Sequence, residues 1–186
     1  MKRALRFCLW LTMVFAFPSM AAYAQNHADT CRLETKYDRE MNSTTVECAL
    51  LESFMPPIRL MVQANASFQG KRPNETAKFQ LSLAAFRNGS NRHTTPLFKD
   101  ATTLLLNLGT SHLEIPVTEF RTEFFEMNRL LAEQANAAVS GEDLRKLLQA
   151  KSLKGKWGNT EFDLSETALA SLKTFISGQM FAAPSQ

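Results

Sequence analysis

A basic segment in the last third of the chain is the first place where side chains could do chemistry. Lys154 and Lys156 are two residues apart and directly precede Trp157. Residues at i and i+2 share one face of a strand, so the two lysines would lie together. Cations beside an exposed aromatic ring could bind a glycan, a phosphate or single-stranded nucleic acid. The same alternation places Trp157 with Leu153 on the opposite face, which favours a buried Trp157 and lysines that keep an edge strand soluble.

Two carboxylates follow on the next predicted strand. Glu161 and Asp163 would share a face about 7 Å apart, a separation that suits acid–base catalysis. The alternative, which we favour, is a solvated face opposite Phe162. The sequence contains no GxSxG, HExxH, P-loop, CxxC or GxGxxG motif. No catalytic residue, metal site or cofactor is therefore predicted.

A polar stretch over 87–96 is the second candidate region for ligand contact. It is predicted to be a long exposed loop and carries positive charge at Arg87, Arg92 and His93. Loops carry many binding residues. A hydrolase would be favoured only if a pocket brought His93 or His112 to a carboxylate, because a histidine in an exposed loop is otherwise solvated.

Residues 1–24 predict a cleaved secretory signal peptide. A basic start precedes an apolar run over 7–17, and Ala22-Tyr23-Ala24 is typical of a cleavage site before Gln25. The run is too short to cross about 30 Å of hydrocarbon. No later segment is longer, so we expect no transmembrane segment in the mature chain and a secreted, periplasmic protein.

The charge of the chain changes once this segment is removed. The full sequence has 21 basic and 18 acidic residues, a formal net charge of +3. The excess lies at Lys2, Arg3 and Arg6, so the mature chain is neutral. A chain with no net charge has lost the main electrostatic support for binding a nucleic acid, and its remaining positive charge is only local. The expected partner is therefore a protein or a small ligand in the cell envelope, and not a nucleic acid.

Two cysteines remain in the mature chain, Cys31 and Cys48. In an oxidising compartment an even pair predicts a disulfide, which would stabilise the fold by about 3 kcal/mol. A metal or redox pair is the alternative, but the CxxC spacing is absent. The disulfide would join the first predicted strand to its neighbour.

Alternating apolar residues and turn signals predict the strands that must position these side chains. The predicted strands cover 33–37, 44–50, 58–68, 78–86, 102–108, 112–117, 151–157 and 160–164. Gly158-Asn159 is a two-residue hairpin turn. Ser140 and Ser165 predict the N-caps of two helices, the first ending near Ala150 and the second at Gly178.

Residues 119–139 fit two structures. The composition over 123–136 favours a helix, whereas residues 119–124 alternate as a strand does. Four N-x-[ST] sequons would accept glycans only in a eukaryotic secretory pathway, and we interpret them as chance occurrences in a bacterial protein. These sequons begin at Asn42, Asn65, Asn74 and Asn88.

The segment LRKLLQAKSLKGKWGNTEFDLSETALASLKTF, with the strand over 60–68 and the hairpin over 104–117, resembles a broad group of uncharacterised exported bacterial β-rich proteins. The resemblance covers about residues 58–180 and is sharpest at GNTEFDLS, from Gly158 to Ser165. In that group the region matching 119–139 is extended, which favours strand over helix. The resemblance implies no activity and no functional residue.

The sequence therefore predicts an α+β protein: a mainly antiparallel β sheet or sandwich with one or two C-terminal α-helices. We expect a flexible N-terminus over 25–32, a single globular domain over 33–180 and a flexible tail over 181–186. The expected function is a non-enzymatic binding or interaction module. The alternatives are a small periplasmic hydrolase that uses the 87–100 loop and a carrier of apolar ligands with a cavity between sheet and helix.

Overall fold

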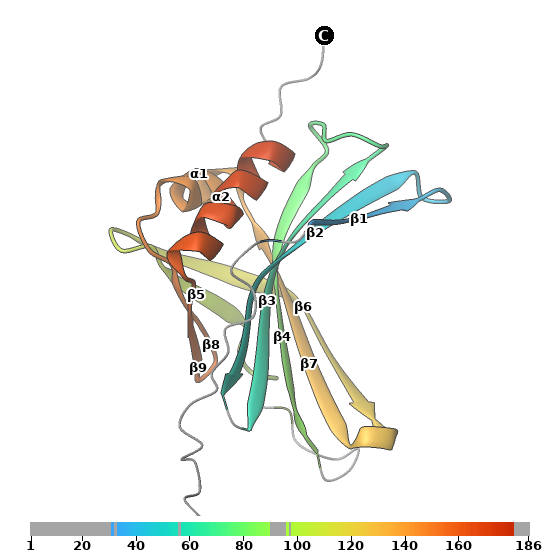
Figure 1. Ribbon diagram of the computed structural model, residues 1–186, viewed down its shortest axis with the longest axis vertical. Helices are drawn as coiled ribbons and strands as arrows, with labels where there is room; N and C mark the ends of the chain where they lie inside the picture. Colours follow the sequence, from blue (N-terminus) through green and yellow to red (C-terminus); the bar gives the residue numbers. More distant parts are fainter. Residues whose placement is uncertain (1–30, 32, 56, 90–95, 97, 181–186) are drawn as a thin grey trace, which may run out of the picture.

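The computed structural model describes residues 31, 33–55, 57–89, 96 and 98–180. In these residues nine strands form one antiparallel sheet in the order β1-β2-β3-β4-β7-β6-β5-β8-β9, and two α-helices lie against it (Figure 1). The α+β, mainly antiparallel fold is confirmed. The strands are β1 (Leu33–Asp38), β2 (Ser43–Met55), β3 (Ile58–Gln69), β4 (Lys78–Asn88), β5 (Thr103–Asn107), β6 (His112–Phe125), β7 (Leu130–Val139), β8 (Lys154–Trp157) and β9 (Thr160–Asp163). The helices are α1 (Gly141–Gln149), α2 (Glu166–Met180) and the 3₁₀ turn η1 (Glu126–Asn128).

Strand β6 divides this sheet into two parts because it changes partner along its length. Its first residues pair with β5, up to Pro116 opposite Thr103. From Val117 onward it pairs with β7, and the register shifts between Val117 and Glu119. A broad part made of the long strands β2, β3, β4, β7 and β6 therefore continues into a small part made of β5, β8 and β9 (Figure 1).

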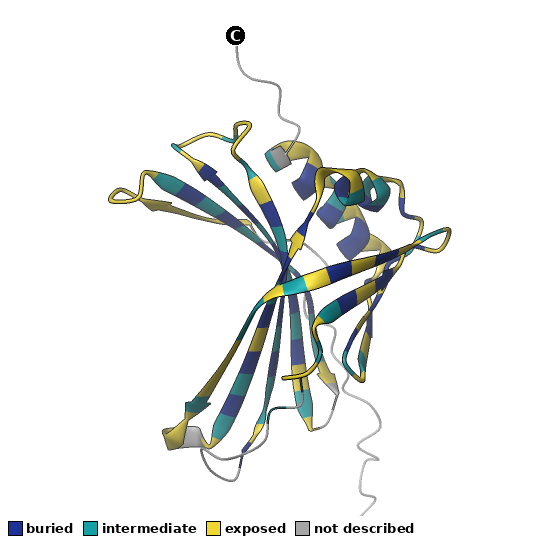
Figure 2. Ribbon diagram, turned by 180° about the vertical axis from the view of Figure 1, so that it is seen from behind, coloured by how far each residue is buried: buried dark blue, intermediate teal, exposed yellow. Residues whose placement is uncertain are grey.

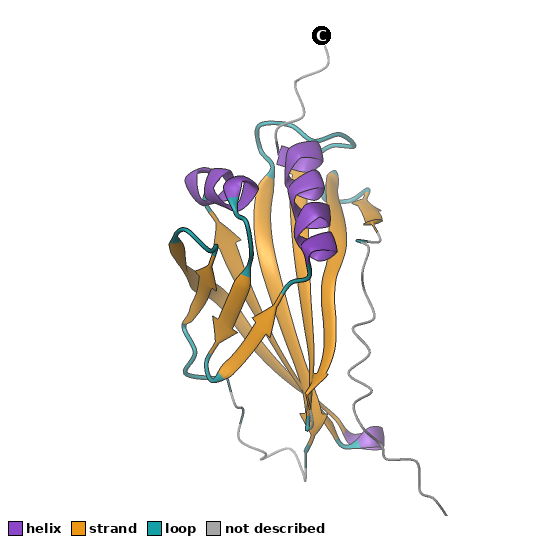
Figure 3. Cartoon of the chain, turned by 60° about the vertical axis from the view of Figure 1, so that its left-hand side comes forward, coloured by secondary structure: helices purple, strands orange, loops and turns teal. Residues whose placement is uncertain are grey.

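The core lies between the broad part of the sheet, the helices and the small part. Buried and less buried residues alternate along the long strands, as the period of two predicts (Figure 2). Both helices lie on one side of the sheet (Figure 3). Helix α2 buries Leu172, Phe175 and Ile176, and the Phe175 ring lies 5.8 Å from that of Phe79 on β4.

Residues 119–125 and 130–139 are strand, so the extended structure implied by the resemblance is confirmed and the α-helix favoured by composition is wrong. Strand β6 runs to Phe125, and β7 begins after η1, with Arg129 in the left-handed region at φ 51°. Along β7 every second residue from Leu131 to Val139 is buried. Burial between β4 and β6 outweighs the helix propensity of this alanine-rich segment.

Most of the predictions made from local signals at helix ends and turns are confirmed. Ser140 accepts a hydrogen bond from the Asp143 N–H, 3.1 Å away, and so caps α1. Gly158 has φ 57° in the β8–β9 turn. The prediction that Gly178 ends the second helix is wrong, because α2 continues to Met180 and Gly178 does not adopt a positive φ.

The structure brings Cys31 and Cys48 to bonding distance, as predicted: their Sγ atoms are 2.13 Å apart. Leu33 lies opposite Cys48 in the β1–β2 register, so the bond joins the start of β1 to β2. The predicted signal peptide, the flexible segment over 25–32 apart from Cys31, and the tail over 181–186 lie outside the described residues.

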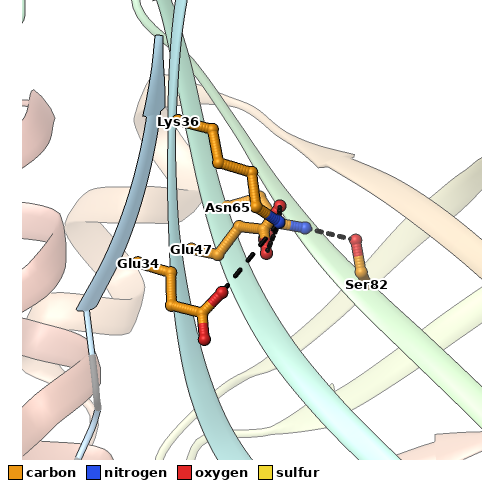
Figure 4. A network of polar contacts seen from close by, with 5 residues as sticks. All are labelled: Glu34, Lys36, Glu47, Asn65 and Ser82. Carbon is orange, nitrogen blue, oxygen red and sulfur yellow. Dashed lines mark hydrogen bonds and ion pairs between the residues drawn. The ribbon is translucent and has the colours of Figure 1, made fainter.

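A row of polar side chains crosses the face of the sheet that points away from the helices. Asn136 Nδ2 donates to Glu119 Oε2 at 2.8 Å, and Ser82 Oγ donates to Asn136 Oδ1 at 2.7 Å. Asn65 Nδ2 in turn donates to Ser82 Oγ at 2.5 Å (Figure 4). An ionised carboxylate only accepts hydrogen bonds. Because Glu119 stands at one end of the row, each side chain donates its hydrogen bond toward Glu119. The buried Asn65 Oδ1, at the end of the row, has no hydrogen-bond partner among the described residues. The side-chain nitrogen of Asn65, which would accept the glycan of this sequon, is engaged in the fold.

This row predicts how stability depends on pH. Hydrogen bonds from Asn136 and then Arg121 hold the pKa of Glu119 below its ordinary value of 4.5. The ionised carboxylate therefore stabilises the fold at neutral pH, and this contribution is lost as pH falls from about 4.5 through the lower pKa of the folded state. We expect wild type to be more stable than E119Q at neutral pH, and the difference to shrink in acid. Urea unfolding at a series of pH values measures the difference in free energy of unfolding between the two proteins. If this difference does not change with pH, the role of Glu119 is contradicted.

Candidate functional site

A surface groove of about 600 Å³ crosses β6, β5, β8 and β9 in the small part of the sheet. The strand registers arrange its side chains in two rows, one on each side of a floor of backbone. One row consists of His112, Asn107, Lys154 and Asp163, and the other consists of Glu114, Leu105, Lys156 and Glu161. The groove therefore combines residues from four strands, which belong to two hairpins far apart in the chain.

The residues between the two rows point the other way, into the core, and they fix the position of the groove. The Phe162 ring lies directly on Gly155, where a β-carbon would overlap it. Trp157 is fully buried, as predicted, and its ring stacks on Phe98 with centroids 4.0 Å apart. Trp157 Nε1 donates to the Ala101 carbonyl at 3.3 Å. These contacts hold the β8–β9 hairpin against β5.

Both predicted lysines are paired with the two carboxylates of the neighbouring strand. Lys154 Nζ lies 3.1 Å from Asp163, and Lys156 Nζ lies 3.2 Å from Glu161. The prediction that these lysines lie on an edge strand is wrong, because β8 pairs with β5 on one side and with β9 on the other. All four side chains are exposed, so each ion pair contributes at most about 1 kcal/mol. A charged ligand group can replace either partner at little cost.

The other end of the groove carries charge that is not paired. Neither the Glu114 carboxylate nor the His112 imidazole makes a hydrogen bond or ion pair with another described residue. Between Glu114 and Lys156 lies Leu105, which is 41% exposed. The Asn107 side chain accepts a hydrogen bond from the Gly109 N–H at 2.9 Å and so stabilises the hairpin turn. Glu114 therefore offers a negatively charged group to a ligand at this end of the groove.

Arg87, the one described cation of the second candidate region, does not join this groove. Arg87 lies in β4, where its side chain is 15% exposed, and its Nε is 3.3 Å from Oε1 of the buried Glu133. Glu133 Oε2 also accepts from the Phe98 N–H at 2.9 Å. The strand extends beyond the predicted start of the loop because Arg87 pairs with Leu131 of β7. Arg92 and His93 lie outside the described residues.

A second groove, of about 420 Å³, lies between β1 and α2 and is mostly apolar. Its lining includes Leu33, Ala170 and Phe175. It lies at the rim of the sheet, whereas the described space between sheet and helices is filled by packed core side chains. This groove is the nearest counterpart of the cavity expected for an apolar-ligand carrier.

Sequence reasoning missed three residues of the main groove: Leu105, Asn107 and Glu114. The strands that carry them were predicted, and their alternation already placed Leu105 and Asn107 opposite the buried Leu104 and Leu106. The missing information was the pairing of β5 with β8, which joins segments about fifty residues apart.

Comparison of the chain with protein-family models, with curated proteins and with solved structures finds no match. No described helix is long and apolar enough to cross a membrane. Among the described residues, no three His, Cys, Asp or Glu side chains are grouped as metal ligands. The function is therefore inferred from the groove itself.

Proposed function

We propose that this protein is an exported, periplasmic binding module without catalytic activity, one of the exported bacterial β-rich proteins that its sequence resembles. Its ligand site is the groove across β6, β5, β8 and β9. The observation that carries the proposal is that Glu114, which has no ion pair or hydrogen bond with a described residue, lies beside the exposed Leu105 in one row of the groove. The signal-like N-terminus and the cysteine pair support export.

The geometry of the groove supports an extended peptide as the ligand. Four strands are separated by three spacings of about 4.8 Å, so the groove is about 14 Å long and holds about four extended residues. The floor hydrogen bonds are already used within the sheet, so recognition depends on side chains. A cationic residue fits Glu114, and a neighbouring aliphatic residue fits Leu105.

Two blocked peptides test this proposal: acetyl-Ala-Lys-Leu-Lys-Ala-amide and its counterpart with glutamate in place of both lysines. We expect the lysine peptide to bind and the glutamate peptide not to bind, measured by isothermal titration calorimetry. Glu114→Gln should weaken binding about tenfold, as expected for the loss of one charge-assisted contact. Glu75→Gln, which removes an exposed carboxylate in the β3–β4 turn, is the matched control and should bind as wild type. Preference for the acidic peptide, or no binding of either, would reject the proposal.

A hydrolase is the competing function, and one observation favours it: His112 and three carboxylates line the same groove. A general base must lie within hydrogen-bond reach of its partner, yet no hydrogen bond or ion pair joins His112 to a described carboxylate. Turnover of peptide or ester substrates that disappears in His112→Ala, with the fold intact, would establish the hydrolase and overturn the binding module.

A further inference from the structure

Strand β1 is a free edge of the sheet in the described part of the chain. It is first in the strand order and pairs only with β2. All six of its residues are exposed, and it lies at the rim of the sheet (Figure 1). An unpaired strand edge is a template for pairing with another chain unless it is covered or blocked.

The two faces of β1 differ in character. Leu33, Thr35 and Tyr37 lie opposite buried residues of β2, on the side of the sheet that faces α2. Leu33 is 54% exposed and Tyr37 is 38% exposed. Glu34 and Lys36 lie on the other face, opposite Glu47 and Thr45. The helix side of the strand thus carries uncharged residues, with the Lys71 ammonium 5.3 Å from the centre of the Tyr37 ring, and the outer side is charged.

Two carboxylates, Glu34 and Glu47, lie near Lys36, and Glu34 makes the longer contact with it. Lys36 Nζ is 3.1 Å from Glu47 but 4.0 Å from Glu34 (Figure 4). Two carboxylates therefore share one described cation, and Glu34 lies at the free edge. A cation from another molecule could pair with Glu34.

A second copy of the same strand supplies that cation in only one register. Two-fold symmetry pairs the two edges antiparallel. When the register is centred on Thr35, Glu34 of each copy lies opposite Lys36 of the other copy. Leu33 of each copy likewise lies opposite Tyr37 of the other copy. Centring the pair on Lys36 or on Glu34 instead brings like charges together, which is destabilising. The sequence of β1 is therefore complementary to itself.

We propose that this protein forms a symmetric dimer through antiparallel pairing of β1 with β1 of a second copy, centred on Thr35. The apolar groove beside α2 fits this arrangement. Leu33 lines that groove with Phe175 and Ala170, and Tyr37 of the second copy would lie next to Leu33 at its mouth. A six-residue edge is a small interface, so the dimer is reversible and weak.

Charge reversal tests the register directly in sedimentation equilibrium of the oxidised, naturally processed protein. Wild type should show a concentration-dependent monomer–dimer equilibrium. The variants E34K and K36E should each self-associate at least tenfold more weakly, because each places like charges opposite one another. Glu75→Lys, in an exposed turn away from β1, is the matched control and should dimerise as wild type.

Mixing the two variants separates a lost interface from a damaged fold. In a mixed dimer of E34K with K36E, every charge again faces its opposite, so the mixture should recover the wild-type dissociation constant. Three results would overturn the proposal: wild type that stays monomeric, single variants that dimerise as tightly as wild type, or a mixture that stays monomeric.

Discussion

Glu133→Ala is expected to lower the free energy of unfolding by about 3–5 kcal/mol, the range for removing one partner of a buried ion pair. Glu133 is 1% exposed, and its carboxylate accepts from both Arg87 and the Phe98 N–H. Alanine leaves the guanidinium and the amide N–H facing each other across the space of the lost carboxylate. Denaturant unfolding followed by tryptophan fluorescence measures the change, because Trp157 stacks on Phe98.

The control for this prediction lies on the neighbouring strand. Glu123 is an exposed carboxylate of β6, and Glu123→Ala should change stability by less than about 0.5 kcal/mol. The double variant R87M/E133L should lose less stability than the sum of its single changes, because it removes both charges together. Equal losses for Glu133→Ala and Glu123→Ala would show that the buried pair does not hold β4 to β7.

Gly155→Ala is expected to destabilise the protein by about 3 kcal/mol, the upper part of the usual range for overpacking a core. A β-carbon at this position would overlap the Phe162 ring, which is buried against the core. The ring must leave its place, and β9 would move with it because Gly155 and Phe162 are paired. Peptide binding in the groove should weaken as well, since Lys154 and Lys156 flank Gly155.

Gly178→Ala is the matched substitution with the opposite expectation. Apart from the adjacent residues and the helix's own backbone, no described atom lies within 4 Å of a β-carbon there, and the residue is inside α2. Alanine is the better helix former, so stability should rise by about 0.5–1 kcal/mol. Thermal unfolding of the two variants compares them directly. A loss of stability at both positions would mean that the Phe162 contact is not the cause.

Local signals predicted most of the elements because they depend on neighbours in the chain. Ser140 and Asp143 are three residues apart, which is enough to form the cap of α1. Gly158 adopts the positive φ that its hairpin turn requires. The alternation along β3 depends only on successive side chains pointing to opposite faces. Each of these signals acts over a few residues, so the sequence displays it directly.

Strand β7 shows where local signals fail. Its composition favours a helix, and Ala135 and Ala137 are buried although alanine carries no preference for one face. The buried Glu133 further conceals the alternation, because a carboxylate in the core needs partners that the local sequence does not show. Those partners, Arg87 and the Phe98 N–H, lie 46 and 35 residues away.

The sequence by itself determined the candidate lysines, the cysteine pair, most of the elements and the fold class, because residue type, spacing and short-range geometry are enough for these. Only the tertiary structure decided that Lys154 and Lys156 are paired with carboxylates on an interior strand, and that Glu114 and Leu105 lie beside them. Strand order decides which side chains meet across the sheet. That order follows from long-range burial of the whole core, and no single segment of the sequence encodes it.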